Sequence, residues 1–531
     1  MTEVSDPLSR EGAIQFNIGS HYEWGAERGK ECMKRASKLL WGVAAFAFVV
    51  MLPACGDDEA TIVDPEEDLP PTIALATPNG GETVQPDSDL EITWTATDDH
   101  EVVGVDLSYT SGGGTQTIAT GVTGSSYTWT VPDANLFSVT VKAVATDSAG
   151  QTAEDVSDGI FAVVTHSARG YVTSDVCQNC HIDYYNDIFA SAHPYKLNAV
   201  VNGQPPVYPN STVPDTPVGV TWDDIAYVIG GYGWKARYIT ADSGWIMTNA
   251  MDGVDVQYNI PRSDLGGGLG SEWVSYHATD TERKPYDCGS CHTTGWQDLT
   301  ENGGVHQDGL IGIEGTWEEL GITCEACHGS GVDHVASQSP SDITIDETAE
   351  LCGNCHTRDA ARRVLTSGGF IRHHEQYDEL KLGGKDSFDC GTCHEPHIGT
   401  RYGNDAAGGI LVTCESCHAD KVANNTHNSA PSCIDCHMSR ATKSARAVHD
   451  NEGDVRTHIF TINTNAVDKS AMFVVDPADG KEIAEPFVTL DFACYSCHKP
   501  SVADGGDPTQ GGSNSTKTLA DLAAKATGIH N

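Results

Sequence analysis

GITCEACHGSGVDH, Gly321 to His334, holds two cysteines separated by two residues, a histidine directly after the second cysteine, and another histidine six residues further on. A Cys-x-x-Cys pair can bind zinc, exchange a disulfide or anchor a prosthetic group. Each use predicts a different protein. The rest of the chain decides between them.

The same five-residue pattern recurs along the chain. Cys-x-x-Cys-His occurs at eight places: Cys177–His181, Cys288–His292, Cys324–His328, Cys352–His356, Cys390–His394, Cys414–His418, Cys433–His437 and Cys494–His498. These copies use every cysteine of the chain except Cys32 and Cys55. The pattern is the attachment signature of c-type haem, in which two thiols add to the vinyl groups and the adjacent histidine becomes the proximal iron ligand.

Two other uses of paired cysteines fit less well. A zinc ribbon gives no reason for a histidine after every pair, and a thioredoxin-like motif occurs once, beside a strand-helix-strand pattern. We therefore predict eight c-type haems. Their thioether cysteines are Cys177, Cys180, Cys288, Cys291, Cys324, Cys327, Cys352, Cys355, Cys390, Cys393, Cys414, Cys417, Cys433, Cys436, Cys494 and Cys497. Their proximal iron ligands are His181, His292, His328, His356, His394, His418, His437 and His498.

The unused histidines indicate how the irons are coordinated. The chain has 22 histidines. After removal of the eight in the motifs, and of His21, His100, His166 and His530 outside or at the edges of the haem region, ten remain. Methionine, the other common ligand, is scarce there. We therefore predict two histidine ligands for every iron, with low potentials.

Particular distal ligands follow less directly from the residues. Our candidates are His193, His277, His334, His374, His397, His427, His449 and His458. His334 lies too close to its own motif to reach easily over the same porphyrin, so we expect it to ligate a neighbouring haem. His374 is preferred to His373 because of its place in the His-Glu-Gln-Tyr pattern. Any one of these histidines could instead bind a propionate or face solvent.

Several stretches resemble a known family: CQNCHIDYYNDIFASAHPYKLN, GITCEACHGSGVDH, HHEQYDEL followed by CGTCHEPH, and HNSAPSCIDCHMSR followed by DVRTHIF. They resemble the multihaem cytochromes that include the tetrahaem electron acceptor of hydroxylamine oxidoreductase, and the surface multihaem cytochromes of metal-reducing bacteria. The resemblance covers Cys177 to Phe460. It implies close haem stacking, and distal ligation by histidines placed like His193, His334, His374, His397, His427 and His458. Eight motifs in place of four, and a preceding sandwich, depart from the family and leave the redox partner open.

The N-terminal region predicts export. From Met33 the chain reads MKRASKLLWGVAAFAFVVMLPAC, with a basic start and an apolar run from Leu39 to Leu52. This run is shorter than the about 20 residues of a spanning helix, so residues 33–54 are interpreted as a signal peptide. Its end resembles a lipobox, which predicts lipidation of Cys55, although Pro53 departs from the usual small residue. Residues 1–32 are interpreted as a misannotated upstream segment, and an uncleaved anchor is the alternative.

The remaining chain divides into segments that differ in composition and residue pattern. Residues 55–71 are interpreted as a linker, and residues 72–164 as an immunoglobulin or fibronectin-like β-sandwich with Trp94 in its core. Asp98, Asp99 and Asp147 could bind calcium at a loop end, although ordinary turn residues are the preferred interpretation. Residues 170–500 form the predicted octahaem domain, which is mainly helical and irregular around the haems, with a small β-rich insert. Residues 501–531 are interpreted as a flexible tail.

Charge and composition limit the function. The net charge of −44 excludes nucleic acid and anionic lipid as partners, so membrane contact should come through a lipid anchor. The leading hypothesis is an extracytoplasmic electron-transfer protein without catalytic residues, at the outer membrane or cell surface, or facing the periplasm. Its partners would be other cytochromes, copies of itself in a filament, and an extracellular acceptor such as a metal oxide. The alternative is an oxidoreductase with one open haem for a small nitrogen or sulfur oxyanion, and a third hypothesis is a binding module based on the sandwich.

Overall fold

The computed structural model describes residues 67–530, except positions 214, 266–267, 360–361, 402–407, 428–430 and 510–513. The predicted upstream segment, signal peptide, Cys55 lipidation site and most of the linker therefore lie outside the described residues. Within the described ranges, no helix is both long and apolar enough to cross a membrane.

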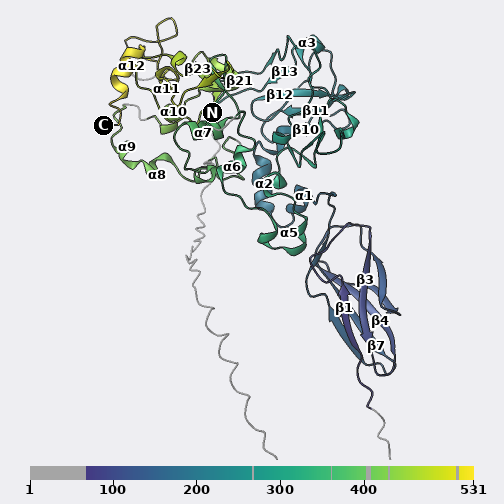
Figure 1. Ribbon diagram of the computed structural model, residues 1–531. Coiled ribbons are helices and arrows are strands. Elements are labelled where there is room, and N and C mark those ends of the chain that lie inside the picture. Colours follow the sequence, from purple (N-terminus) through teal and green to yellow (C-terminus); the bar gives the residue numbers. More distant parts are fainter. Residues whose placement is uncertain are drawn as a thin grey trace, which may run out of the picture. The chain divides into compact units, whose positions relative to one another are not determined.

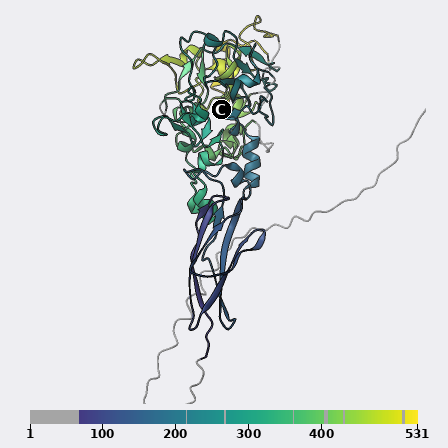
Figure 2. The ribbon, with the colours of Figure 1, turned by 90° about the vertical axis from the view of Figure 1, so that its right-hand side faces the viewer.

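Residues 72–163 form two facing sheets (Figures 1 and 2). The three-stranded sheet has the order β1 (Thr72–Thr77), β3 (Asp89–Thr97), β6 (Ser126–Thr130). The second sheet has the order β2 (Thr83–Val84), β9 (Phe161–Val163), β7 (Leu136–Asp147), β4 (Val102–Ser111), β5 (Gly114–Val122), and β8 (Thr152–Val156) pairs with β7. The alternating pattern of the sequence thus produces the predicted sandwich.

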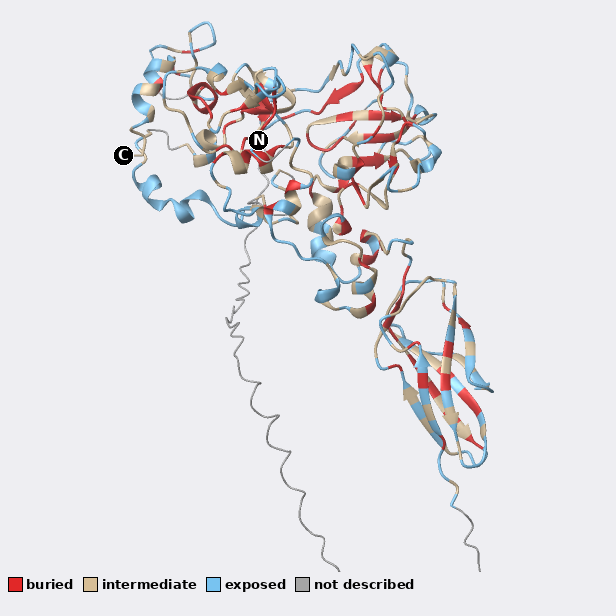
Figure 3. Ribbon diagram, in the orientation of Figure 1, coloured by how far each residue is buried: buried red, intermediate tan, exposed pale blue. Residues whose placement is uncertain are grey.

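The core of the sandwich follows from strand periodicity. Successive side chains of a strand point to opposite faces, and along β7 Val139, Val141, Ala143 and Ala145 are all buried (Figure 3). Trp94 on β3 faces them and is 2% exposed, as predicted for a core residue.

The long segment between the first two motifs contains the predicted β-rich insert. Its antiparallel sheet runs β10 (Leu197–Ala199), β11 (Ile225–Gly230), β12 (Lys235–Thr240), β13 (Gln257–Asn259), β14 (Glu272–Val274). Tyr208, Tyr238 and Tyr258 are buried in one cluster with Val228 and other apolar residues. The aromatic residues of the insert therefore pack against one another, as the sequence indicated.

Helices in the remaining chain are short. The α-helices are α1 (Ser174–Cys177), α2 (Ile182–Ala190), α3 (Asn249–Asp252), α4 (Cys324–His328), α5 (Val332–Ser337), α6 (Ala349–Gly353), α7 (Gln376–Leu382), α8 (Cys414–Cys417), α9 (Ala419–Ala423), α10 (Cys433–His437), α11 (Leu490–Cys494) and α12 (Leu519–Ala526). The 3₁₀ helices are η1 (Pro194–Lys196), η2 (Trp222–Asp224), η3 (Gly289–Cys291), η4 (Gln307–Gly309), η5 (Pro340–Asp342), η6 (Cys390–Thr392) and η7 (Lys469–Ala471). Helix α12 lies in the segment predicted as a flexible tail, and its side chains pack against α11.

Small sheets tie these helices together. One sheet has the order β19 (Thr366–Ser367), β20 (Phe370–Arg372), β21 (Thr442–His449), β22 (Glu452–Val455). Three two-stranded sheets pair β15 (Thr293–Thr294) with β18 (Glu319–Leu320), β16 (Gln297–Asp298) with β17 (Gly315–Thr316), and β23 (Phe473–Val475) with β24 (Glu482–Ala484). This part of the chain is a mainly helical and irregular domain, in agreement with the predicted fold class.

Candidate haem sites

Every Cys-x-x-Cys-His motif overlaps a helical turn: α1, η3, α4, α6, η6, α8, α10 or α11. Residues three apart lie on the same face of a helical turn. Both thiols of a motif therefore point to one side, and the histidine follows directly. Local helical geometry is sufficient to place the three groups that attach and ligate a haem.

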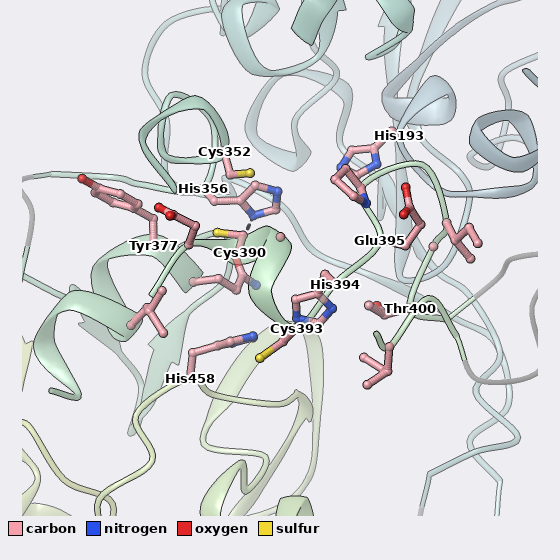
Figure 4. Close-up of a pocket in the computed structure, with 18 of the residues that line it drawn as sticks. His193, Cys352, His356, Tyr377, Cys390, Cys393, His394, Glu395, Thr400 and His458 are labelled. Carbon is pink, nitrogen blue, oxygen red and sulfur yellow. Dashed lines mark hydrogen bonds between the residues drawn. The ribbon is translucent and has the colours of Figure 1, made fainter. Parts of the chain in front are cut away.

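The motifs surround one large interior cavity of about 3690 Å³. All of the motif cysteines except Cys497 line it, as do all of the motif histidines except His498. Figure 4 shows part of this space, with Cys352, Cys390 and Cys393 among the lining side chains. A continuous cavity lined by thiols and imidazoles has the donor groups that c-type haems require.

Six motif histidines face a second histidine at a similar separation. With metal–nitrogen bonds of about 2 Å, two imidazoles on opposite sides of one metal have ring centres roughly 6 Å apart. The ring centres of the facing pairs are 5.9–6.4 Å apart. The pairs are His181 with His334, His328 with His397, His356 with His193, His394 with His458 (Figure 4), His437 with His530, and His498 with His427. The separations fit bis-histidine coordination.

Hydrogen bonds at Nδ1 orient many of these rings. Oxygen acceptors lie 2.8–3.2 Å from the Nδ1 atoms of His292, His328, His334, His356, His397, His437, His498 and His530. Donation from Nδ1 leaves Nε2 available to a metal and fixes the plane of the ring. The Nδ1 atoms of His394 and His458 are buried, with no hydrogen-bond partner among the described residues.

His356 has two histidine neighbours. The rings of His193 and His374 are each centred 6.4 Å from it. His374 has a left-handed backbone conformation with φ 71°, and its ring lies 4.4 Å from that of His373. Since His193 and His374 lie equally far from His356, the separation alone assigns neither of them to it.

Two motif histidines lack such a partner within the part of the chain that the structure describes. No histidine ring centre lies within the range of the other pairs from His292 or from His418. His292 is half-buried, whereas His418 is exposed at the end of α8.

Three other histidines have neighbours that the sequence analysis did not predict. His277 and His449, both predicted as distal ligands, contact carboxylates: His277 Nδ1 is 2.7 Å from Asp280, and His449 Nε2 is 3.1 Å from Glu452. His530, which the sequence analysis set aside as terminal, faces His437 instead. The sequence signal for it was the capping box of α12, in which Thr518 and Asp521 bond each other's backbone amides. That box predicts a helix that brings the chain end back to the domain.

Contacts between thiols reveal the order of the motifs in space. The pKa values of Cys177, Cys355 and Cys390 are raised, first by hydrogen bonds to thiols of other motifs and then by burial. The thiol pairs in contact are Cys177 with Cys324, Cys355 with Cys291, and Cys390 with Cys352. More distant electrostatic neighbours are Cys327 with Cys352, Cys393 with Cys414, Cys433 with Cys414, and Cys436 with Cys497. The motifs therefore follow one another as first, third, fourth, fifth, sixth, seventh and eighth, with the second beside the fourth.

Cations gather on one wall of the cavity despite the acidic composition. Lys196, Arg262 and Arg401 each lie 5.4–5.9 Å from the ring of Trp234. Burial lowers the pKa of Lys196 to about 8 and also lowers the pKa of Arg358. Arg262 and Arg401 face Asp264 at 2.8 and 3.6 Å, whereas half-buried Lys196 lines the cavity, and a haem propionate is a carboxylate of the charge that would pair with it. This wall thus also fits the predicted cofactor.

These features describe a c-type cytochrome region that follows an immunoglobulin-like domain in the sequence. Residues 71–143 match the bacterial Ig domain family, and residues 271–329, which contain two motifs, match the family of cytochrome c554 and c-prime. Both predictions, the Ig-like sandwich and the relation to multihaem c-type cytochromes, are confirmed by these matches. The cytochrome match supports an electron-transfer cytochrome that carries c-type haem.

Two solved structures are similar to this chain. The outer cell wall cytochrome OcwA matches with 16% identity and a TM-score of 0.39, over 67% of this chain and 86% of its own. The fibronectin(III)-like modules of Clostridium thermocellum CbhA match with 23% identity and a TM-score of 0.14, over 16% of this chain and 44% of theirs. No curated protein matches the sequence significantly.

Proposed function

We propose that the protein is an extracytoplasmic cytochrome with eight c-type haems that carries electrons along its motifs toward an acceptor outside the cell. The observation that supports it best is the series of facing histidines along one cavity, at ring separations of 5.9–6.4 Å. The paired cysteines of each motif would hold the cofactor, and the motif histidine with its facing histidine would supply the axial ligands. A c-type haem supplies a one-electron iron couple, and two strong ligands restrict it to outer-sphere electron transfer.

The chain has three tasks in this function. It holds thiols of neighbouring motifs against one another, which keeps successive redox centres close. It orients the imidazoles through Nδ1 hydrogen bonds, which also makes them stronger ligands. Lys196 beside Trp234 would compensate propionate charge, while the acidic remainder of the chain favours ferric iron.

A haem count tests the number of sites. The full-length protein, matured in a host that attaches c-type haem, should contain eight haems per chain by pyridine haemochrome assay and intact mass. Replacement of Cys433 and Cys436 by serine should lower the count to seven, whereas Cys32→Ser should leave it unchanged. A count below eight in the wild-type protein would show that some motifs are not used.

One observation favours a second candidate function. Burial, together with nearby Lys196, lowers the pKa of His292 to about 4, and Arg237 and Arg358 also act on it. An iron held by His292 alone would have an open position in cationic surroundings, suited to a small nitrogen or sulfur oxyanion. The protein would then be an oxidoreductase.

Electron paramagnetic resonance separates the two functions. The oxidised, fully loaded protein is measured before and after addition of nitrite and of hydroxylamine. Low-spin signals alone, unchanged by either compound, would mean that every iron has two ligands and that the protein is a conduit. A high-spin signal that changes on addition would favour the oxidoreductase.

We also propose that Cys55 is lipidated and holds the protein at the outer membrane or the cell surface. The support is the apolar run that ends in the lipobox-like Leu52-Pro53-Ala54-Cys55. Partners would be other cytochromes, further copies of this chain in a filament, and an extracellular metal oxide. Cys55→Ala should abolish labelling by a radioactive fatty acid and release the protein from membranes. Cys32→Ala is the matched control and should change neither.

A further inference from the structure

One end of the sandwich carries a compact acidic group. Oxygen or nitrogen atoms of Asp68, Asp98, Asp99 and His100 lie within 4.8 Å of one another. Asp68 precedes β1, and the other three residues form the turn between β3 and β4. Acidic turns are common on protein surfaces, so the group by itself does not define a metal site.

A buried carboxylate at the same end supplies an independent observation. Asp147 is the last residue of β7 and continues the buried row of Val139, Val141, Ala143 and Ala145. It is 2% exposed. Its Oδ1 accepts hydrogen bonds from the backbone amides of the turn that follows, at 2.8 and 2.9 Å. Its Oδ2 is buried and has no hydrogen-bond partner among the described residues.

Asp98 repeats this arrangement on the opposite sheet. Ile92, Trp94 and Ala96 are alternate residues of β3 and point toward the core. Asp98 comes two residues after Ala96, so it lies on the same side of the strand. Its Oδ2 accepts a hydrogen bond of 3.0 Å from the amide of His100. Its Oδ1 is buried and has no hydrogen-bond partner within the described ranges. Both core-facing rows therefore end in a carboxylate oxygen without a donor.

Strand pairing and hydrogen bonds connect the end of β7, where Asp147 lies, with the acidic group. Asp147 pairs with Val102, just after the acidic turn, and the Ser148 amide donates to the Glu101 carbonyl at 3.1 Å. Gln151 bridges the remaining parts: its backbone amide donates to Asp147 Oδ1, and its side-chain amide donates to Asp68 Oδ2 at 3.1 Å. Asp147, whose Oδ2 has no partner among the described residues, therefore belongs to the same end of the sandwich as the acidic group.

The charge of this end is uncompensated. Among the described residues, the one basic side chain within ion-pair distance of these carboxylates is His100, 3.2 Å from Asp68 and 3.6 Å from Asp99. Buried carboxylates without donors are costly unless a cation or hydrogen bonds satisfy them. Several carboxylate oxygens that converge are the ligands that Ca²⁺ prefers, at flexible geometry.

We propose that Asp68, Asp98, Asp99 and Asp147 bind one Ca²⁺ at this end of the sandwich. On binding, Asp68 and Asp99 exchange their contact with His100 for the cation. Asp68 lies near the end of the predicted linker 55–71, so the bound ion would connect Asp68 to Asp98 after β3 of one sheet and to Asp147 on β7 of the other. Extracellular modules bind Ca²⁺ with dissociation constants of about 10⁻⁴–10⁻³ M, and this site belongs to that range because water completes its shell.

The proposal is tested on the full-length protein with its haems attached. Equilibrium dialysis with radioactive Ca²⁺ in excess Mg²⁺ should show one more bound ion per chain in the wild type than in Asp98→Asn or Asp147→Asn. The control is Asp133→Asn, which removes an exposed carboxylate from the opposite end of β7 and should bind as the wild type does. Equal binding in all four proteins would overturn the proposal.

Calorimetry supplies a second readout. About 10 mM Ca²⁺ should raise the unfolding temperature of the sandwich by roughly 5–10 °C, and either substitution should abolish the rise. In EDTA, Asp98→Asn should unfold at the wild-type temperature or above it, because the substitution removes the negative charge of a carboxylate whose Oδ1 is buried and has no hydrogen-bond partner among the described residues. A rise that persists in both variants, or a rise with Zn²⁺ but not with Ca²⁺, would exclude this oxygen site.

Discussion

Replacement of His530 by alanine should leave the Cys433–Cys436 attachment motif with a single axial histidine. The ring of His530 is centred 5.9 Å from that of His437, and its Nδ1 is 3.1 Å from the Lys421 carbonyl. Within the described part of the chain, no other histidine ring lies at the ligand-pair separation from His437.

The effect should be local. The chain end stays attached in the variant because the Thr426 amide donates to the Ile529 carbonyl at 2.8 Å, and α12 packs on α11. The free energy of unfolding should therefore fall by less than about 1 kcal/mol, apart from the lost iron bond. Coordination, in contrast, changes at one of the eight predicted centres. The six facing pairs correspond to six low-spin centres, so about one-sixth of the low-spin ferric intensity should become high-spin.

Spin quantification by electron paramagnetic resonance measures this change, and a haem count shows that all cofactors remain attached. His277→Ala is the matched control, since His277 contacts Asp280 and faces no motif histidine. Its spectrum should equal that of the wild type. The reasoning fails if His530→Ala keeps the full low-spin intensity, or if His277→Ala loses as much.

Glu379 is fully buried and accepts hydrogen bonds from Thr442, Thr457 and the amide of His458. Glu379→Ala should therefore lower the free energy of unfolding by about 3–5 kcal/mol in denaturant titrations, and a change below about 1 kcal/mol would contradict this. Asp264 forms a two-bond ion pair with buried Arg262 and is half exposed, so Asp264→Asn should cost about 1–2 kcal/mol at pH 7. In the folded protein the pair, chiefly through its hydrogen bonds, lowers the pKa of Asp264. The difference in unfolding free energy between wild type and Asp264→Asn should therefore be complete above about pH 5 and shrink as the pH falls below about 4. A difference that stays constant below about pH 4 would refute this. Trp94→Ala should destabilise the sandwich by about 3–5 kcal/mol in calorimetry while the haem count stays unchanged, and loss of haem would show that the two parts do not fold independently.

The attachment motifs were predictable from the sequence because their chemistry is local. Two cysteines three residues apart and the next histidine need one helical turn, and each motif has one. The sandwich was predictable for a similar reason. The alternation that buries Trp94 and Val141 on facing strands is already present in the order of residues along each strand.

Distal ligands were harder to assign because they depend on contacts between distant segments. His181 faces His334, which follows the third motif, and His437 faces His530 at the end of the chain. No local pattern distinguishes these histidines from His277 or from those outside the haem region. A count of histidines therefore predicts only the kind of coordination, and the particular pairs depend on the tertiary structure.

The sequence by itself determined that a β-sandwich precedes the attachment motifs, and it predicts which cysteines and histidines attach haem, because covalent attachment and strand alternation depend on residues close together in the chain. Only the tertiary structure decided which imidazoles face one another, in what order the motifs follow, and that Asp98 and Asp147 end two core rows at the same place. Those relations arise from the packing of segments that are remote in sequence, and the free energy of that packing is shared among many contacts, so no short stretch of residues contains it.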